Sequence, residues 1–370
     1  MKYNMEKEKS KISVCKSIVM TGVYYKHYHP GGISSVIQSW SEYFDDLQYY
    51  PTFMETNSLG KIYIFIKTLV CLFVKLLFDK HVKIVHIHTA ADHDFWRSEK
   101  IVRLALLFNK KIILHSHASR FKDFYAECPD KKKQWIKDTL LSVDILIVLS
   151  ESWRKWFESI GIPASKIVIL HNITPFPSLK QEKPVYKSLG DKINFLFLGE
   201  IGFRKGVFDL VNTIINHRSE LREKMCLHIG GNKNEQKLKS MITNGDVSDI
   251  IKFEGFICAD KKIEQLNWSD VYILPSFNEG LPISILEAMS YGMPIISTPV
   301  GGIPEVVDET NGVLVTPGNE EEIYMALMKY IENPDTIVFQ GNKSTEKVRE
   351  YLPDKVISNL DSIYKKLIES

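Results

Sequence analysis

Two glutamates mark the segment 275–287, which carries the strongest chemical signal in this chain. An apolar run ends at Leu274, a turn of Pro, Ser, Asn and Gly follows, and apolar residues at helical spacing begin at Ile283. Glu279 precedes the predicted helix, and Glu287 lies two turns into it. A helix N-terminus offers N–H donors and partial positive charge, which suits a diphosphate flanked by hydroxyl-binding carboxylates. The alternative is that Glu279 only caps the helix and Glu287 is solvated.

Three glycine-containing turns also follow predicted strands. In residues 199–206, Arg204 and Lys205 stand at the start of a predicted helix, where cations and N–H groups together favour phosphate. Basic residues in an ordinary surface loop are the alternative. Glycine pairs ending at Gly32 and Gly231 are further candidates for close backbone approach, but neither forms the GxGxxG pattern of a standard dinucleotide fold.

Two His-x-His pairs, His86/His88 and His115/His117, end predicted strands, and each pair points to one face of its strand. With the acids in 92–94 they are candidate ligands for the metal of a hydrolase. The pairs lie on different strands and HExxH is absent, and Asp is favoured in turns after strands. We therefore expect no bound metal, and one histidine that donates a hydrogen bond to a sugar.

The bulk composition is that of an ordinary globular protein. The chain has 370 residues, 44% of them hydrophobic and 25% charged, which favours two domains. A net charge of +2 gives no reason to expect nucleic-acid binding. Five cysteines without ligand spacing and a polar N-terminus without a signal peptide predict a cytoplasmic protein with reduced thiols.

Predicted strands and helices alternate along the whole chain, which indicates parallel sheets. The predicted strands are 17–23, 82–88, 111–117, 144–149, 167–170, 193–198, 225–229, 251–253, 271–274, 294–297 and 312–315. The segment 174–191 holds three prolines and many polar residues, so we expect a linker there. The fold class that follows is α/β, with two doubly wound Rossmann-like domains facing a cleft. Their predicted bounds are 1–176 and 177–354.

The segment 61–80 predicts an unusually apolar helix. Its longest uninterrupted apolar span lies between Lys67 and Lys75, far below the ~20 residues needed to cross a bilayer. Its polar residues share an arc of roughly 120°, so the apolar arc is wider than one packing face requires. Either a second protein element or a membrane surface covers the excess.

The motifs occur together in an order that resembles the retaining glycosyltransferase family 4, of the bacterial capsular and surface-polysaccharide type. The matching fragments are Leu198-Gly199 to Lys205-Gly206, Ile229-Gly230-Gly231, Phe253 to Phe256, Leu274-Pro275-Ser276, Glu279 to Pro282, Glu287-Ala288, Gly292 to Ile296, Gly301 to Glu305 and Asn311 to Val315. Each fragment is weak alone, but their order is specific. The resemblance implies the GT-B fold, with a C-terminal helix at about 355–370 packed on the first domain.

The resemblance also implies residue roles. Glu279 would bind the hydroxyls of the transferred sugar and Lys205 the phosphates, supported by Arg204. His117 would contact the sugar near C6. The family usually has arginine after the first glycine of the phosphate loop, whereas this chain has Glu200, so Arg204 would supply the second charge.

The remaining implied roles concern the nucleotide. Gly32 and Gly231 would let backbone approach the donor, Glu287 would bind the ribose, and the turn at Ile257 would hold the base. The backbone at the start of the helix would cradle sugar and phosphate, through Gly280, Leu281, Pro282 and Ile283.

The implied activity is transfer of a hexose or N-acetylhexosamine from a nucleotide sugar, UDP-linked, to a glycan acceptor on a polyprenyl-diphosphate lipid. No cofactor and no metal are expected, because positive protein groups replace the divalent cation. A lipid-linked acceptor implies peripheral attachment to an anionic surface at the inner face of the plasma membrane. The alternatives are a soluble transferase making a small glycoside, and a catalytically inactive GT-B-like binding subunit.

Overall fold

The computed structural model describes residues 11–26, 32–117, 119–174 and 188–370. Contacts between residues divide the chain into two units. The first comprises Met1–Ile173 and Tyr351–Ser370, and the second comprises Thr174–Glu350. The expected boundary between residues 176 and 177 lies outside the described residues, so each unit is considered by itself.

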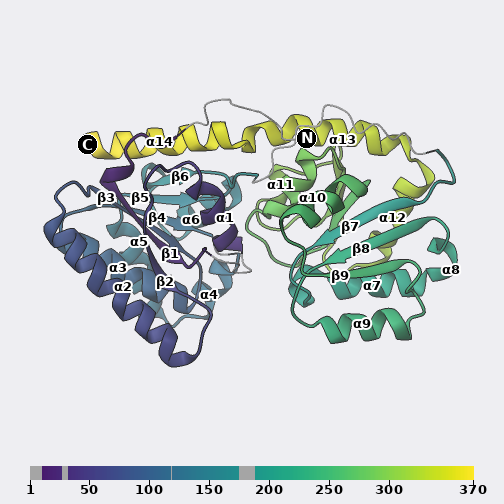
Figure 1. The fold of residues 1–370 in the computed structure, drawn as a ribbon, viewed down its shortest axis with the longest axis horizontal. Helices are drawn as coiled ribbons and strands as arrows, with labels where there is room; N and C mark the ends of the chain where they lie inside the picture. Colours follow the sequence, from purple (N-terminus) through teal and green to yellow (C-terminus); the bar gives the residue numbers. More distant parts are fainter. Residues whose placement is uncertain (1–10, 27–31, 118, 175–187) are drawn as a thin grey trace. The chain divides into compact units, whose positions relative to one another are not determined.

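The first unit is a parallel sheet of six strands in the order β2-β1-β3-β4-β5-β6 (Figure 1). Its strands are β1 (Ile18–Val23), β2 (Gln48–Phe53), β3 (Ile84–Thr89), β4 (Lys111–Ser116), β5 (Ile145–Val148) and β6 (Ile167–Ile169). Its helices are α1 (Gly32–Ser41), α2 (Ser58–Phe78), α3 (His93–Leu107), α4 (Phe121–Glu127), α5 (Asp130–Ser142), α6 (Glu151–Ser159) and α14 (Pro353–Glu369). The strand β2 is absent from the sequence prediction. It carries Pro51, which an edge strand tolerates.

Alternation along β3 separates the two faces of this sheet. Val85 and Ile87 point into the core shared with α2, α3, α5 and α6. His86 and His88 point to the opposite face, where α1 places the fully buried Trp40. The C-terminal helix α14 packs on the same face and belongs to this unit through its contacts with β3.

The second unit is another parallel six-stranded sheet, in the order β12-β11-β10-β7-β8-β9. Its strands are β7 (Ile193–Leu198), β8 (Met225–Gly230), β9 (Ile251–Gly255), β10 (Val271–Leu274), β11 (Ile295–Ser297) and β12 (Gly312–Leu314). Its helices are α7 (Val207–Asn216), α8 (Arg218–Leu221), α9 (Glu235–Asn244), α10 (Ala259–Trp268), α11 (Ile283–Ser290), α12 (Glu320–Glu332) and α13 (Asp335–Lys347). Helices α7 and α9 lie on one side of the sheet, and α10 and α11 on the other (Figure 1). The predicted fold class, two doubly wound parallel sheets, is confirmed.

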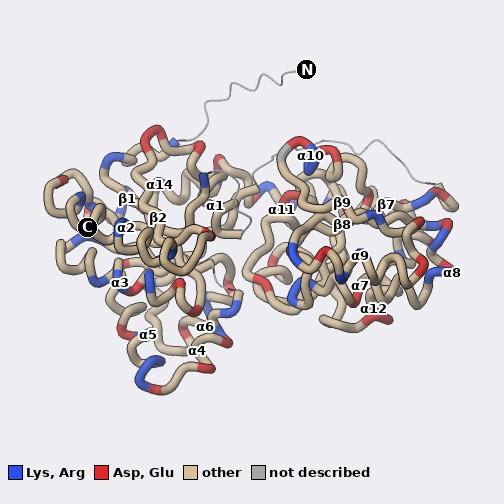
Figure 2. The backbone as a smooth tube through the Cα atoms, turned by 60° about the horizontal axis from the view of Figure 1, so that its bottom comes forward, with Lys and Arg blue, Asp and Glu red and all other residues tan. Residues whose placement is uncertain are grey.

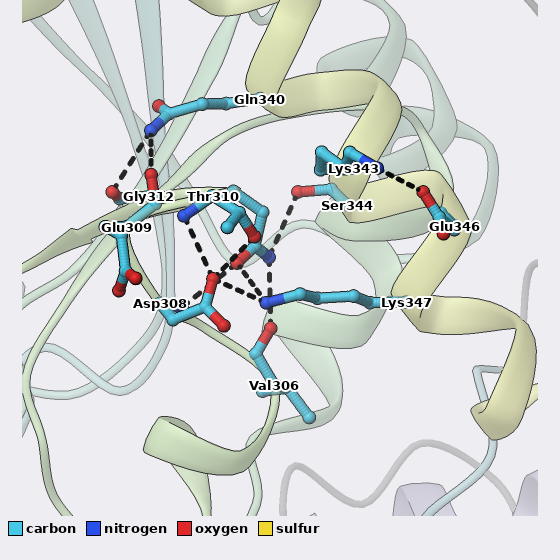
Figure 3. A network of polar contacts seen from close by, with 11 residues as sticks. Val306, Asp308, Glu309, Thr310, Gly312, Gln340, Lys343, Ser344, Glu346 and Lys347 are labelled. Carbon is cyan, nitrogen blue, oxygen red and sulfur yellow. Dashed lines mark hydrogen bonds and ion pairs between the residues drawn. The ribbon is translucent and has the colours of Figure 1, made fainter.

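A polar network fastens α13 to the loop before β12 (Figure 3). The fully buried Asn311 donates to the carbonyl of Val306 at 3.0 Å and accepts from Lys347 Nζ at 3.1 Å. Lys347 also pairs with Asp308 at 2.6 Å. Gln340 donates to the Glu309 carbonyl at 2.8 Å. A loop with this many satisfied polar groups gives β12 a fixed position at the sheet edge.

Helix α2 occupies the segment predicted as an apolar helix, but its orientation differs from the expectation. Its buried residues are Thr68, Leu72 and Leu76, so the polar arc lies partly inward while most of the apolar arc is exposed. Among the described residues, no helix combines the length and hydropathy needed to cross a membrane.

Candidate functional site

Four loops of the second unit meet at the carboxyl ends of β7, β8, β10 and β11. Gly231 lies so close to the Gly199 carbonyl that an added Cβ would come within 2.0 Å of its oxygen. The Phe277 amide donates to the Arg204 carbonyl at 2.8 Å, joining the loops after β10 and β7. Because ligands of open parallel sheets bind at this edge, the four loops define the candidate site.

A buried ion pair occupies the centre of the site. Lys205 Nζ lies 2.5 Å from Glu279 Oε1, which also accepts from the Ser276 hydroxyl at 2.8 Å. Arg204 Nη1 lies 3.7 Å from the same oxygen and donates to the Asn278 carbonyl at 3.1 Å. The predicted grouping of Lys205, Arg204 and Glu279 is thus present in the structure.

Lys205 and Glu279 are both largely buried. Their side chains are only 14% and 7% exposed. Burying a carboxylate is costly unless partners satisfy its oxygens, and here a hydroxyl and two cations surround Glu279 Oε1. The pair therefore contributes to folding as well as to any chemistry at this position.

Glycine at two positions allows this close packing. Gly206 has φ +67°, and a Cβ there would lie 1.9 Å from the Pro275 carbonyl oxygen. Gly301 has φ +58°, and its Cβ would meet the Glu279 carbonyl oxygen at 2.0 Å. A side chain at either position would push apart the loops that hold Lys205 against Glu279.

Glu287 lies on α11 and is fully buried, with 1% of its side chain exposed. Both of its carboxylate oxygens accept from Lys262 Nζ, at 2.8 and 3.0 Å. Burial raises the pKa of Glu287, and the charge of Lys262 opposes that rise. The alternative that Glu287 is a solvated helix residue is therefore wrong. Sequence reasoning missed Lys262, because it reaches Glu287 from α10 and no motif links the two helices.

Glu200 forms an ion pair with Lys233, whose Nζ lies 3.0 Å from Glu200 Oε2. Lys233 and Asn234 both have positive φ, 65° and 37°, which is uncommon for residues other than glycine. Asn234 holds this turn by donating to the Ile201 carbonyl at 2.8 Å. Lys233 thus brings a cation beside the loop where Glu200 replaces the arginine of the family pattern. The only sequence signal for Lys233 is its position directly after the Gly230-Gly231-Asn232 turn.

The other predicted contact residues are placed as follows. Gly280, Leu281 and Pro282 are buried immediately before α11, and the partly exposed Ile283 begins it. Ile257 is buried, and its side chain packs over Gly230. Gly32 is the exposed first residue of α1, with open space around its Cα, and its neighbour in the glycine pair falls outside the described residues.

The four histidines of the two pairs form one stack in the first unit. The two pairs come from different strands, as predicted, but β3 and β4 are adjacent in the sheet and place His88 opposite His115. His115 and His117 stack at 4.1 Å between ring centroids, and His88 Nδ1 lies 2.8 Å from His117 Nε2. The structure therefore places His117, the predicted sugar contact, at the end of a continuous histidine stack.

Three of these histidines, His86, His88 and His115, hold ring nitrogens within 4.8 Å of one another. Both ring nitrogens of His86 are already engaged, by Tyr364 Oη at 2.6 Å and by His115 Nδ1 at 3.4 Å. Nε2 of His88 and Nε2 of His115 are buried without a hydrogen-bond partner among the described residues, so the group is a ring stack that is only partly hydrogen-bonded. Burial lowers the pKa of His86 to about 3 and also lowers that of His117. The stack is therefore neutral near pH 7.

Comparison with known proteins identifies the second unit. Residues 180–353 match the family model described as "Glycosyl transferases group 1". The match covers nearly all of the second unit. Over 275 residues, the chain is 25% identical to the uncharacterized glycosyltransferase MJ1069 of Methanocaldococcus jannaschii, with 71% of this chain and 70% of the relative covered. It is 26% identical to the amylovoran biosynthesis glycosyltransferase AmsK of Erwinia amylovora, where 53% of this chain and only 49% of the relative are covered.

A solved structure extends the likeness to both units. Anabaena HepE, determined in complex with UDP and glucose, superposes with a TM-score of 0.71 at 13% identity. The superposition covers 94% of this chain and 99% of HepE. At that identity the likeness shows the fold alone, and the fold is GT-B. The segment that matches the glycosyl transferases group 1 model contains the Lys205–Glu279 pair.

Proposed function

We propose that this protein is a retaining glycosyltransferase that moves a hexose or N-acetylhexosamine from a UDP-sugar to a glycan acceptor in surface-polysaccharide biosynthesis. The observation that carries the proposal is the buried Lys205–Glu279 pair beside the N-terminus of α11, inside the segment that matches the glycosyl transferases group 1 model. The name of AmsK, a relative in amylovoran biosynthesis, supports the polysaccharide role. The UDP and glucose in HepE support the choice of donor.

The contacts of Lys205 and Glu279 indicate how the donor would engage the site. Diphosphate at the N-terminus of α11 competes with Glu279 for Lys205, because a diphosphate with two negative charges attracts the ammonium more strongly than one carboxylate does. Glu279 would then turn its oxygens from Lys205 to the sugar hydroxyls. Ser276 and Arg204 keep that carboxylate in place during the exchange.

Cleavage of the bond between sugar and diphosphate builds negative charge on the leaving oxygens. Lys205, Arg204 and the start of α11 stabilise that charge, and burial strengthens each interaction. In the proposed mechanism the acceptor hydroxyl attacks from the same face and passes its proton to the leaving diphosphate, so the anomeric configuration is retained. No cofactor is required, and positive side chains take the place of a divalent cation.

Glu287 and Lys262 form the part of the site proposed for the ribose. Burial holds Glu287 away from solvent, and Lys262 fixes both of its oxygens. A ribose hydroxyl that donates to Glu287 would share this carboxylate with the lysine. His117, on the first unit, is proposed to contact the transferred sugar as a neutral hydrogen-bond donor or acceptor.

The acceptor is proposed to be a glycan on a polyprenyl diphosphate, which would place the enzyme in the cytoplasm at the inner face of the plasma membrane. A soluble acceptor and an inactive binding subunit are the competing outcomes. The deciding assay presents UDP- and GDP-sugars separately and measures release of UDP or GDP. Release from a UDP-sugar supports the proposal, and release from none of them identifies a binding subunit. NMR of the product then reports whether the anomeric configuration is retained.

Matched variants assign the activity to the site. Lys205→Ala should lower donor turnover by at least ~100-fold, the scale of losing ~3 kcal/mol of transition-state stabilisation. Lys239→Ala is the control, because Lys239 is 61% exposed and pairs with Glu235 on α9. Equal rates for the two variants would contradict the assignment of Lys205.

A further inference from the structure

Helix α2 presents an apolar face to solvent along its whole length. Nine of the 17 exposed large apolar side chains among the described residues lie on this one helix. Eight of them share an arc of about 120° at 100° per residue, and within α2, all of which is described, no charged residue interrupts that arc. We call this the α2 face, and its members are Leu59, Ile62, Tyr63, Ile66, Val70, Phe73, Val74 and Leu77.

The α2 face is long and continues onto the next helix. From Leu59 to Leu77 it extends about 27 Å at 1.5 Å per residue. Phe73 contacts Phe108 at the end of α3 with ring centroids 5.3 Å apart, and the neighbouring Leu107 is 70% exposed. A contiguous apolar surface of this size is rare on a free-standing protein and marks a docking surface.

The charges beside the face are basic. Lys67 borders its middle, and Lys80 lies just beyond its C-terminal end; both are exposed. An open hollow at that end is lined by Val74, Lys75, Phe78, Asp79, Lys80 and His81, and the one carboxylate among these residues, Asp79, pairs with Lys75. By contrast, Lys61 and Lys75 of the predicted polar arc are partly buried and paired with Glu55 and Asp79.

We propose that the α2 face lies in the headgroup region of an anionic lipid bilayer, with the helix axis parallel to the membrane. An apolar arc bordered by lysines is the pattern of an interfacial helix, in which apolar side chains enter the acyl boundary and cations meet anionic headgroups. A protein of this fold would then be held at the surface without a spanning segment. The inference does not depend on the proposed transfer reaction, although it suits a lipid-linked acceptor.

A second copy of this chain is a less suitable occupant of the α2 face. A two-fold interface brings the same patch together from both copies. The midpoint of the face is residue 68, so an antiparallel pairing of the helices would bring Lys67 close to its own copy. A like-charge contact at the centre of an apolar interface is destabilising, whereas an anionic bilayer neutralises the same lysine.

Vesicle flotation tests the proposal. The full chain is mixed with vesicles of phosphatidylcholine alone, or of phosphatidylcholine with phosphatidylglycerol, at low and high salt. We expect flotation only with the anionic vesicles and a loss of binding at high salt. A wild-type chain that stays with unbound protein on anionic vesicles at low salt would overturn the proposal.

Two sets of variants locate the contact. Ile66→Ser with Val70→Ser should lower anionic-vesicle binding at least tenfold. The control, Met325→Ser with Phe339→Ser, removes equally exposed apolar side chains from the second unit and should bind as wild type. The charge variant Lys67→Glu with Lys80→Glu should also lose about tenfold or more. Its own control reverses the charge of two exposed lysines on α5, Lys131→Glu with Lys132→Glu, and should float normally.

Two further measurements keep the test decisive. If the serine variant fails to fold, an environment-sensitive dye on the exposed Cys71, in a Cys258→Ser chain, must shift to the blue with anionic vesicles. An unchanged dye spectrum would refute the contact. A wild-type dimer that Ile66→Ser with Val70→Ser converts to monomer would reassign the face to self-association. Hydrolysis of a soluble UDP-sugar should be unchanged in these variants, so failure here is distinguishable from failure of the proposed function.

Discussion

Acid should destabilise the first unit through its buried histidine stack. His86 is completely buried, and its pKa is about 3, against 6.5 for an ordinary histidine. Between these values the unfolded chain binds a proton that the folded chain excludes. Stability therefore falls as the pH falls below 6.5, and it is fully present above that value.

The size of the effect follows from the two pKa values. Lowering the pH to about 5 costs about 2 kcal/mol from His86 alone, since each pKa unit corresponds to about 1.4 kcal/mol and about 1.5 units are crossed. His88, His115 and His117 have pKa values lowered by the same burial and act in the same direction. Among the described residues, the groups recorded against the His86 ring are Trp40, His88, His115 and the Tyr364 hydroxyl, and none of them is a carboxylate that would compensate for protonation.

Tryptophan fluorescence isolates this unit. Five of the six tryptophans lie in the first unit, and a Trp268→Phe chain removes the sixth. We would measure urea unfolding near pH 7.5 and near pH 5 in that background. A His86→Gln variant should lose about 2 kcal/mol less on acidification than its parent, whatever its absolute stability. The exposed His81→Gln serves as control. If the two variants show the same acid loss as the parent, His86 is not held neutral by burial.

Four other expectations concern the second unit and its proposed activity. Glu279→Gln should lower donor turnover about 100-fold and also lower the melting temperature, because it removes one partner of a buried ion pair; wild-type melting would contradict the burial. Glu200→Gln should free Lys233 for phosphate and lower the donor KM a few-fold, whereas an unchanged KM would place Lys233 outside the site. Asn311→Ala should destabilise the unit by about 2–3 kcal/mol in denaturant titrations without changing donor KM. Turnover should persist in EDTA, and an absolute requirement for Mg²⁺ or Mn²⁺ would refute the cation-replacement argument.

The sequence predicts the elements of this protein better than the environment of its site residues. Alternation of apolar runs is enough for the two parallel sheets, because buried parallel strands are continuously apolar. The order of motifs is enough to group Lys205, Arg204 and Glu279. Lys262 was beyond prediction, because its ion pair with Glu287 joins two helices that only the tertiary fold brings together. Lys233 was likewise missed, because its position depends on a left-handed turn that its residue type does not favour.

The histidines show that a sequence motif predicts a cluster only when the strands that carry it are neighbours in the sheet. Two His-x-His pairs on separate segments are weak evidence for a cluster, but β3 and β4 pair in register and bring all four rings onto one face. The cost of burying them is limited only if they remain neutral and bond to one another. His117, the proposed sugar contact, is subject to the same requirement, because its Nε2 is hydrogen-bonded to His88 Nδ1 within the buried stack.

Helix α2 shows the same limit at the level of a surface. Its sequence places polar residues in one arc and apolar residues in the other, and amphipathicity alone would turn the apolar arc inward. The fold instead buries Thr68, whose hydroxyl bonds to the Pro51 carbonyl of β2, and leaves Ile66 and Val70 outside. An apolar arc turned away from the core is costly in water unless another phase covers it. A bilayer is such a phase, and the basic residues at the edge of the arc make an anionic one the best match.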